Sequence, residues 1–341
     1  MTADRCTVLV TSAGRRGALV ELLRAGGRCA GVTVEVLAVD RSPLSAAGHL
    51  ADRFELVPPV DHPDYLDCLV DLVVRHQVTA VVPTIDPELG VVAAGRSLLA
   101  AAGATAVVSS PETVAITADK HRSRSWMAAA GFPVPDGHER SDLEGLGADA
   151  WPLFFKPRWG SSSVGAHPVF SPAEVDLAVA RYGEGVIEER VEGEEVTLDC
   201  WVGAGGACRV VVPRRRLSVR AGEVANGVTV DRPDLVRSTT ALVEALPGAC
   251  GPVTVQAIDA EDGHRFIEAN PRFGGGYPLS HAAGARLTAV LVAETTGRPV
   301  DEAWFRWRPG VTMLRYDAAV FLDADPACHH RFGASAVGPS S

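Results

Sequence analysis

Three polar residues in the last third of the chain have the types and spacing of a metal site. Glu268 and Asn270 alternate with Ile267 and Ala269, so an extended strand would place both polar side chains on one face. Gln256 lies on an earlier apolar run, which an Asp-Gly turn can fold back opposite them. One carboxylate and two amide oxygens are hard ligands, suited to Mg²⁺ already held by nucleotide phosphates. The alternative is a structural cross-strand polar network.

Lysine is rare in this chain, because only Lys120 and Lys156 of its 32 basic residues are lysines. Where a positive charge alone is needed, arginine serves, so the two lysines mark positions that need a compact ammonium, unless they survived by chance. Lys156 ends an apolar run and precedes a Gly/Ser-rich loop, whose amides and hydroxyls can approach phosphate oxygens closely. A loop without a ligand is the alternative. The candidate contacts in this loop are Gly160, Ser161, Ser162, Ser163 and Gly165.

Two further segments suit a nucleotide and an acyl group. The acidic run of residues 188–195 is either a solvated turn or a hinge, at which backbone groups read an adenine edge and a carboxylate holds ribose hydroxyls. Three consecutive glycines offer bare backbone amides, suited to a carboxylate or a tetrahedral intermediate. These glycines are Gly274, Gly275 and Gly276.

Arginines would meet the reacting groups. Arg272, just beyond the metal candidates, is placed to stabilise a phosphoryl group in transfer. In the Arg-Arg-Arg run that precedes residue 217, the first and third side chains share a strand face. We expect Arg214 or Arg216 to meet a carboxylate or an acyl phosphate, with a solvated arginine stripe as the alternative.

The N-terminal region offers candidates for the rest of the substrates. Arg15 and Arg16, in the sequence SAGRRG, begin a helix, where an anion is favoured. Asp86 and Glu88 follow another strand and would hold an ammonium. SAGRRG with Asp40 as the ribose acid would instead indicate a dinucleotide site, but the loop lacks GxGxxG spacing.

Two histidine-containing segments are weaker candidates. His281 lies near the expected acceptor pocket, where we expect a packed or capping histidine in place of a catalytic one. We expect the tail segment Cys328-His329-His330 to be incidental, because no fourth metal ligand lies nearby.

The elements that would position these residues change along the chain. Alternating strand and helix signals predict a Rossmann-like α/β domain with a parallel sheet over residues 1–112. Residues 113–191 indicate two helices and then a compact strand–loop–helix–strand unit. Strand signals then predict an α+β domain with an antiparallel sheet over residues 192–325, followed by a flexible tail at 326–341. The expected strands include 6–11, 34–40, 79–83, 104–108, 196–202, 208–212, 253–259 and 264–269, and the expected helices include 64–76, 88–102, 119–130, 233–246 and 286–296.

Composition excludes several classes of protein. The 341-residue chain is 47% hydrophobic and has a net charge of −10, which argues against a general nucleic-acid or anionic-membrane surface. The longest uncharged stretch, residues 97–111, is too short to span a bilayer. The seven cysteines are scattered without CxxC, and the N-terminus lacks a signal-peptide pattern. We therefore expect a cytoplasmic protein with no nucleic-acid or membrane partner.

In their order along the chain, these segments resemble the ATP-grasp superfamily, and most closely its carbamoyl-phosphate-synthase-like carboxylate–amine ligases. The resemblance spans residues 7–296. It rests on TADK ending at Lys120, on FKP around Lys156 with its loop, on ERVEGEE at 189–195, and on Gln256 with EANPR at 268–272. It implies a Rossmann-like pre-ATP-grasp domain, a mobile lid and a central antiparallel sheet, with ATP between lid and sheet.

The resemblance also implies a role for each matching residue. The phosphates of ATP would contact Lys120, Lys156 and the loop from Gly160 to Gly165. The adenine would contact Glu189 and the backbone around Arg190 and Val191, and the ribose would contact Glu195. One or two Mg²⁺ ions, with Mn²⁺ as the alternative metal, would be held by Gln256, Glu268 and Asn270. Relatives often carry an acid at the position of Gln256, although carbamoyl-phosphate synthases also have Gln there.

The implied activity is an ATP-dependent ligase that joins a small-molecule carboxylate to an amine through an acyl phosphate, with release of ADP and phosphate. Amino acids or small metabolites are the expected substrates, and a homodimer is the expected assembly. A carboxylase or carbamoyl-phosphate-type enzyme is one alternative, although the sequence contains no biotin or glutaminase segment. An NAD(P)-binding protein and a catalytically silent nucleotide-binding protein are the others.

Overall fold

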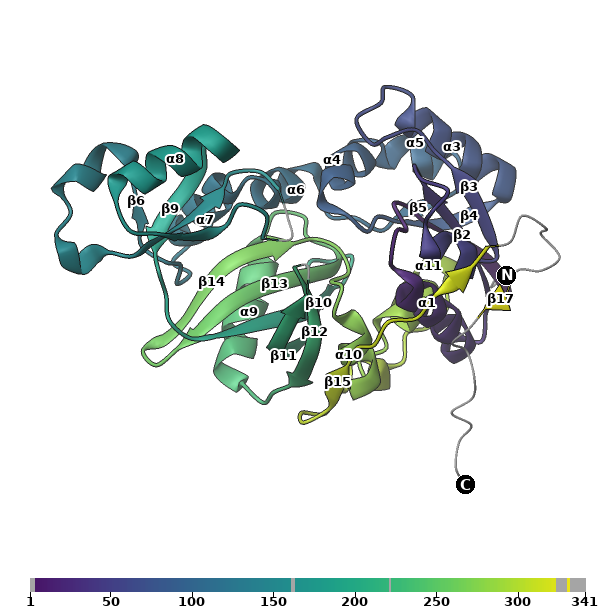
Figure 1. The fold of residues 1–341 in the computed structure, drawn as a ribbon. Helices are drawn as coiled ribbons and strands as arrows, with labels where there is room; N and C mark the ends of the chain where they lie inside the picture. Colours follow the sequence, from purple (N-terminus) through teal and green to yellow (C-terminus); the bar gives the residue numbers. More distant parts are fainter. Residues whose placement is uncertain (1–3, 161–162, 221, 323–329, 332–341) are drawn as a thin grey trace.

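The computed structural model describes residues 4–160, 163–220, 222–322 and 330–331. They form a parallel-sheet region, a smaller lid and a large antiparallel sheet, and the lid lies at the far end of the molecule from the parallel sheet (Figure 1). Within these residues, no helix has both the length and the apolar character to cross a membrane.

The N-terminal region is a five-stranded parallel sheet with the strand order β3-β2-β1-β4-β5, as the alternating pattern predicted. Its strands are β1 (Arg5–Val10), β2 (Thr33–Asp40), β3 (Arg53–Leu56), β4 (Val78–Val82) and β5 (Thr105–Ala106). Its helices are α1 (Gly17–Ala30), α2 (Ala46–Leu50), α3 (Tyr65–His76), α4 (Asp86–Ala94) and α5 (Arg96–Ala101). Helices α6 (Pro111–Ala118) and α7 (Lys120–Ala129) connect this region to the lid, and Ile116 of α6 and Met127 of α7 lie in the core under the central sheet. The predicted helix 88–102 is two helices, because the chain passes within contact of Leu66 at Gly95 and turns there.

The lid is a four-stranded antiparallel sheet with the order β6-β9-β7-β8. Its strands are β6 (Gly137–His138), β7 (Leu153–Pro157), β8 (His167–Val169) and β9 (Gly185–Glu189), and its helices are α8 (Pro172–Tyr182) and the short 3₁₀ turns η1 (Arg140–Gly145) and η2 (Ala148–Ala150). Phe155 and Val175 belong to a small apolar core that lies within the lid alone. The three-residue strand β8 was not predicted, because it is too short to show a period.

The central sheet has six antiparallel strands in the order β14-β13-β10-β11-β12-β15. They are β10 (Glu194–Val202), β11 (Cys208–Arg220), β12 (Glu223–Thr229), β13 (Gly251–Ala260), β14 (Gly263–Asn270) and β15 (Thr312–Leu314), and α9 (Pro233–Ala245) packs on one face. On β10, Val196 and Leu198 face the core under α9, so Thr197 and Asp199 point to the other face. Strand β11 continues well beyond the predicted 208–212. The prediction stopped too early because the second half of the strand is rich in arginine and shows no apolar pattern.

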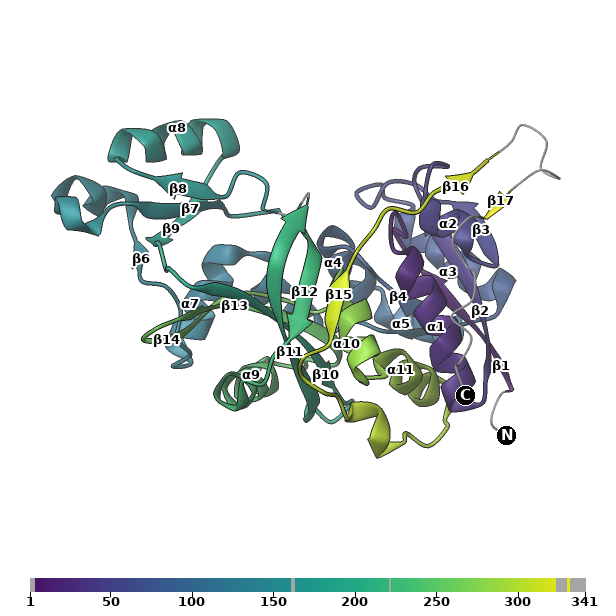
Figure 2. The same cartoon turned by 60° about the horizontal axis from the view of Figure 1, so that its bottom comes forward.

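The chain after the central sheet returns to the first domain. Helices α10 (Tyr277–Ala283) and α11 (Leu287–Thr296) and the turn η3 (Glu302–Phe305) follow β14, and α11 packs against α1 in a core that both regions share. The C-terminal segment then runs from β15 toward α2 (Figure 2), where β16 (Val320–Phe321) pairs with β17 (His330–Arg331). Of the predicted flexible tail, 326–329 and 332–341 lie outside the described residues.

Candidate active site

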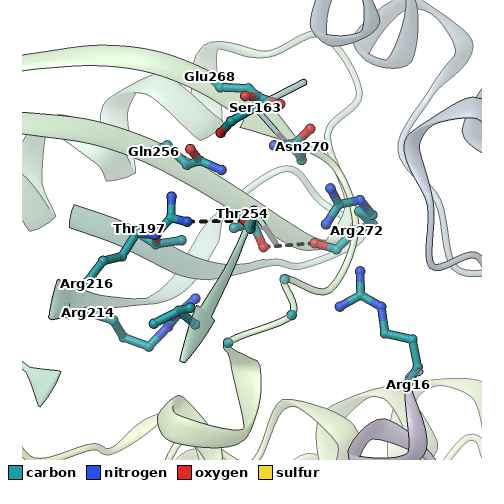
Figure 3. Close-up of a pocket in the computed structure, with 15 residues that line it drawn as sticks. Arg16, Ser163, Thr197, Arg214, Arg216, Thr254, Gln256, Glu268, Asn270 and Arg272 are labelled. Atoms are coloured by element: carbon teal, nitrogen blue, oxygen red, sulfur yellow. Dashed lines mark hydrogen bonds between the residues drawn. The ribbon is translucent and has the colours of Figure 1, made fainter. Parts of the chain in front are cut away.

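The three predicted metal ligands lie together on the polar face of the central sheet. Gln256 on β13 is the direct cross-strand partner of Glu268 on β14, and Thr254 pairs with Asn270 two residues along. All four side chains line one cavity (Figure 3). The geometric prediction of convergence is therefore met, while metal binding itself remains a prediction.

A β-bulge changes one detail of this face. The register shifts after Gln256, so that Ala257 pairs with Phe266 and Ile267 becomes an extra residue on β14. Strict alternation placed Ile267 on the face opposite Glu268. Instead Ile267 and Glu268 both line the same cavity, while Phe266 is buried in the core under the sheet.

A cavity of about 360 Å³ lies between the lid and the central sheet. Its apolar wall comes from both units, with Phe154 from the lid and Ile258 and Ile267 from the sheet. Its polar lining includes most of the predicted nucleotide contacts: Lys120, Lys156, Gly160, Ser163, Glu189, Arg190, Val191 and Glu195. This apolar slot, with charged groups beside it, suits a nucleotide.

The two lysines reach this cavity through different contacts. Lys120 donates its Nζ to the carbonyl of Gly160 at 2.6 Å, which holds the start of the glycine-rich loop. Lys156 forms an ion pair with Glu188, whose residue is only 5% exposed. Glu188 was not predicted as a functional residue, although it directly precedes the ERVEGEE motif. Gly165 does not appear in the described lining but its φ of +77° lets the loop turn, and Ser161 and Ser162 lie outside the described residues.

The strand that leads out of the lid presents backbone groups at the apolar slot. The amide of Glu189 donates to the carbonyl of Asp136 at 2.7 Å. Among the described residues, the amide of Val191 has no hydrogen-bond partner, and Val191 lines the cavity. The amide of Val191 can therefore donate a hydrogen bond to the edge of a ring in a ligand bound in this cavity.

A second cavity, of about 110 Å³, lies beside the first and shares with it the residues Ser163, Arg216, Gln256 and Glu268. Arg214, which is 1% exposed, lines its floor and binds the Asp199 carboxylate through two hydrogen bonds of 2.7 and 3.0 Å. Asp199 also accepts from Ser280 at 2.6 Å. Asp199 was missed by sequence analysis, although a lone charge within the apolar strand 196–202 was a signal that could have found it.

Arg216 stands at the junction of the two cavities. Its Nη1 lies 2.8 Å from the carboxylate of Glu195, and its Nη2 donates to the carbonyl of Gly222. Its Nε is buried and has no partner among the described residues. Glu195, predicted to hold the ribose, is therefore also the ion-pair partner of Arg216.

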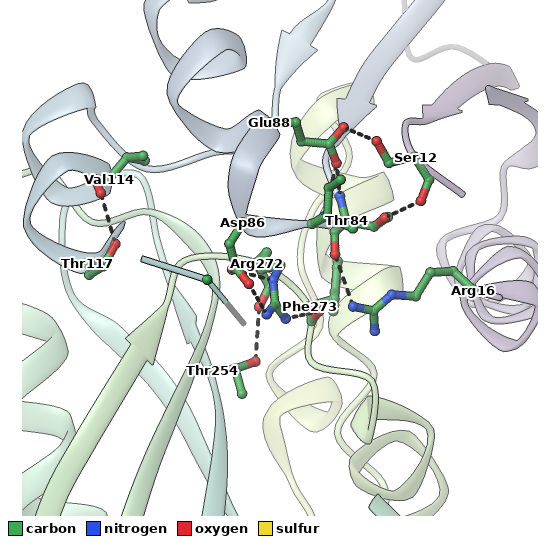
Figure 4. Close-up of polar contacts among 12 residues, drawn as sticks. Ser12, Arg16, Thr84, Asp86, Glu88, Val114, Thr117, Thr254, Arg272 and Phe273 are labelled. Carbon is green, nitrogen blue, oxygen red and sulfur yellow. Dashed lines mark hydrogen bonds and ion pairs between the residues drawn. The ribbon is translucent and has the colours of Figure 1, made fainter. Parts of the chain in front are cut away.

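Two of the predicted substrate residues have other partners in the structure. The Asp86 carboxylate, predicted to hold an ammonium, is already bound to Arg272, which donates two hydrogen bonds of 2.7 Å to it (Figure 4). Glu88 is completely buried and accepts hydrogen bonds from Ser12, Tyr65 and the amides of Thr84 and Ile85. Burial raises the pKa of the Glu88 carboxyl above its usual range. Glu88 thus ties the strand ends together and is not accessible to a substrate, which corrects the prediction.

The SAGRRG loop contributes one residue to the site. Arg16 lines the smaller cavity and donates to the carbonyl of Thr84 at 3.0 Å, whereas Arg15 is exposed and is not among the described residues that line either cavity. The Asp40 carboxylate accepts from the amides of Gly14 and Ser42. This use of Asp40 leaves less support for the dinucleotide reading, in which the same carboxylate would hold a ribose.

The glycine loop that follows β14 approaches the buried arginine closely. Gly274, Gly275 and Gly276 all line the smaller cavity, and a Cβ at Gly276 would come 2.2 Å from Nη1 of Arg214. Arg315, beyond β15, donates to the carbonyl of Gly275 at 2.6 Å. The absence of side chains in this loop is therefore a packing requirement as well as a source of bare amides.

Of the remaining histidine candidates, His281 is not among the described residues that line either cavity. His281 is 7% exposed and its ring packs edge-on against Tyr277 in α10. Cys328 and His329 lie outside the described residues, and His330 is described only as part of β17.

The donor set fits Mg²⁺ only together with a phosphate ligand. Within the described ranges, no group of three or more His, Cys, Asp or Glu side chains could hold a metal. Glu268 supplies a single carboxylate, and Gln256 and Asn270 supply neutral amides. A hard cation bound here would need further oxygens, which nucleotide phosphates provide.

Comparisons with known proteins agree with this architecture. Residues 8–107 match the family model of the PylC-like N-terminal domain, and residues 183–318 match that of the ATP-grasp in the biosynthetic pathway with Ter operon. No curated protein matches the chain in sequence.

Several solved structures share the fold. The biotin carboxylase domain of Hydrogenobacter thermophilus 2-oxoglutarate carboxylase, in complex with MgADP, ADP and bicarbonate, is 18% identical, with a TM-score of 0.68 over 88% of this chain and 71% of that one. N5-carboxyaminoimidazole synthetase from Staphylococcus aureus, complexed with ADP, is 14% identical, with a TM-score of 0.70 over 88% and 79%. L-amino acid ligase from Bacillus licheniformis is 19% identical, with a TM-score of 0.69 over 90% and 78%. Residues 183–318 thus belong to an ATP-grasp family, and residues 8–107, ahead of them, to the family of the PylC-like N-terminal domain.

Proposed function

We propose that the protein activates a small-molecule carboxylate with ATP and transfers the acyl group to an amine. The observation that carries this proposal is the shared lining of the two cavities by Arg216, Gln256 and Glu268. A nucleotide in the larger cavity would place its terminal phosphate at the entrance of the smaller one. The smaller cavity would then hold the carboxylate that is to be phosphorylated.

The nucleotide roles follow from the contacts of the larger cavity. The adenine lies in the apolar slot, where the amide of Val191 donates to its edge, and the ribose lies near Glu195. Lys120 and Lys156 neutralise phosphate charge, and the loop from Gly160 to Gly165 covers the phosphates. The same loop excludes water, which would otherwise hydrolyse an acyl phosphate.

Glu268, Gln256 and Asn270 would hold Mg²⁺, which when bound neutralises charge on the phosphates. Arg216 lines both cavities, at the junction where charge develops during phosphoryl transfer. Arg272 and Arg214 are held by their carboxylate partners and orient the acceptor. Removal of one such contact typically costs about 100-fold in rate.

The chemistry balances in two steps. A carboxylate oxygen forms a bond to the γ-phosphorus of ATP, and the bond to the β–γ bridging oxygen breaks, which releases ADP. The amine nitrogen then bonds to the acyl carbon, the bond between this carbon and the phosphate oxygen breaks, and the amine proton leaves with phosphate or water. The products are an amide, ADP and phosphate.

An assay with hydroxylamine tests this proposal. Hydroxylamine is a neutral amine that converts an acyl phosphate into a stable hydroxamate. With ATP, Mg²⁺ and a panel of small carboxylates, we expect equal amounts of ADP, phosphate and hydroxamate. Formation of AMP and pyrophosphate would refute the acyl-phosphate route, and nucleotide binding without turnover on any acid would favour a silent nucleotide-binding protein.

A bicarbonate-dependent activity is the second candidate. The smaller cavity is compact and lined by arginines, and one structural neighbour was crystallised with bicarbonate. In that case ADP formation would depend on bicarbonate and would yield no hydroxamate from organic acids.

A further inference from the structure

The lining of the smaller cavity is rich in arginine, and three of these arginines are paired with carboxylates: Arg214 with Asp199, Arg216 with Glu195 and Arg272 with Asp86. Four guanidinium groups line it, and among the described residues Glu268 is its one acidic group and Val224 its one apolar side chain longer than a methyl. Its polar neutral groups are the hydroxyls and amides of the sheet face, together with the glycine loop. Such a lining selects anions and offers no surface for an apolar substrate chain.

The cavity also lacks a carboxylate that could recognise an ammonium. The proposed function assigns Glu268 to the metal. The nearby Asp199 and Asp86 are each bound by two hydrogen bonds from an arginine. A zwitterionic amino acid would therefore have to place its ammonium beside carboxylates that are already paired with arginines or assigned to the metal, which is unfavourable.

The guanidinium groups lie on two sides of the cavity. Figure 3 shows Arg214 and Arg216, from β11, on one side, and Arg272 and Arg16 on the other. One carboxylate pairs with one guanidinium face. Two separated groups of arginines therefore suit a ligand with anionic groups at both ends, and the volume of about 110 Å³ requires this ligand to be compact.

Building on the proposed function, we infer that the acyl substrate is a compact dianion, which carries a second anionic group besides the carboxylate that is activated. The activated carboxylate lies on the β11 side, near the junction with the nucleotide cavity. The second group, a carboxylate or a phosphate-type group, lies toward Arg16 and the N-terminal region. Arg16 is then a specificity residue that comes from a different domain than the rest of the acyl site.

The test compares four acids with the same two-carbon spacer in the hydroxylamine assay. Succinate and phosphonopropionate carry a second anion, succinamate carries a neutral amide and β-alanine carries an ammonium. We expect kcat/KM for at least one dianion to exceed that for succinamate and β-alanine by about tenfold or more, as for a hydrogen-bonded charge pair. Comparison of succinate with phosphonopropionate identifies which second group the site takes.

Two variants locate the effect. Arg16→Gln should lower the preference for the dianion about tenfold, measured as the ratio of kcat/KM for the dianion to kcat/KM for succinamate. Arg15→Gln removes the neighbouring exposed guanidinium and should keep the preference. The comparison of acids on the unchanged protein does not depend on whether either variant folds.

The other outcomes separate this inference from the proposed function. If succinamate or β-alanine reacts as well as both dianions, the ligase activity stands and the dianion inference is wrong. If bicarbonate alone supports ADP release, the inference is likewise overturned, in favour of the carboxylase candidate. If no acid yields ADP, the proposed function fails, and the inference fails with it.

Discussion

Arg272 and Asp86, 186 positions apart in the chain, are joined by two hydrogen bonds of 2.7 Å each. Arg272 follows the central sheet, and Asp86 begins α4 of the N-terminal region. The pair is largely buried, with side chains 12% and 20% exposed. Arg272 was expected to act on phosphate and Asp86 to hold an ammonium. In the structure they instead form one ion pair between the two regions, and Asp86 orients Arg272.

Asp86→Asn should lower kcat/KM for the carboxylate about tenfold, because Arg272 loses a charged partner that fixes its direction. The KM for ATP should change little, since neither residue lines the larger cavity in the described structure. A double-mutant cycle with Arg272→Gln checks the mechanism, because residues that act as a pair are not additive. Additive losses in rate would show that Asp86 acts independently of Arg272.

Glu268→Gln should reduce turnover about 100-fold or more while the protein stays folded. The change keeps the shape of the side chain but removes the one carboxylate of the proposed metal site. Steady-state rates over a range of Mg²⁺ concentrations measure the effect, and Glu261→Gln, in the exposed turn before β14, is the matched control. Near-normal rates with unchanged Mg²⁺ dependence would remove Glu268 from the metal site.

Lys156→Arg should raise the KM for ATP about tenfold, because a planar fork replaces a compact ammonium opposite the buried Glu188. The thermal unfolding midpoint should change less than for Lys156→Met, which leaves Glu188 without its counter-charge. Both variants are read by ATP titration and by a melting curve. Unchanged ATP use by the arginine variant would show that the scarcity of lysine carried no functional information.

His281 gives a pH prediction. Burial, reinforced by the charge of Arg286, lowers the pKa of His281 from 6.5 to about 4. Between these values the unfolded chain binds a proton that the folded chain does not, so the free energy of unfolding should fall as the pH drops from about 6.5 to about 4. Urea unfolding at several pH values, compared with His281→Gln, measures this term. An NMR titration of His281 with a midpoint near 6.5 would contradict the prediction even if the variant failed to fold.

Period-two reasoning located the site because the polar residues of β13 and β14 alternate with apolar ones on a sheet that is buried on one side. It could not locate the bulge at Ile267, since an extra residue leaves the local composition unchanged. It also could not pair Arg214 with Asp199, or Arg272 with Asp86, because the register of strands and the packing of domains decide those contacts. For the long strand β11, the predicted range was too short, because the arginine-rich half of the strand has no hydrophobic period.

The position of α11 has a consequence for dissecting the protein. This helix is encoded after the ATP-grasp sheet, yet Leu287 and Val290 fill the same core as Val20 and Leu23 of α1. An excised fragment ending near residue 112 would leave that side of α1 bare, and it should associate or precipitate when expressed alone. Co-expression with the complementary fragment, which carries α11, should restore solubility.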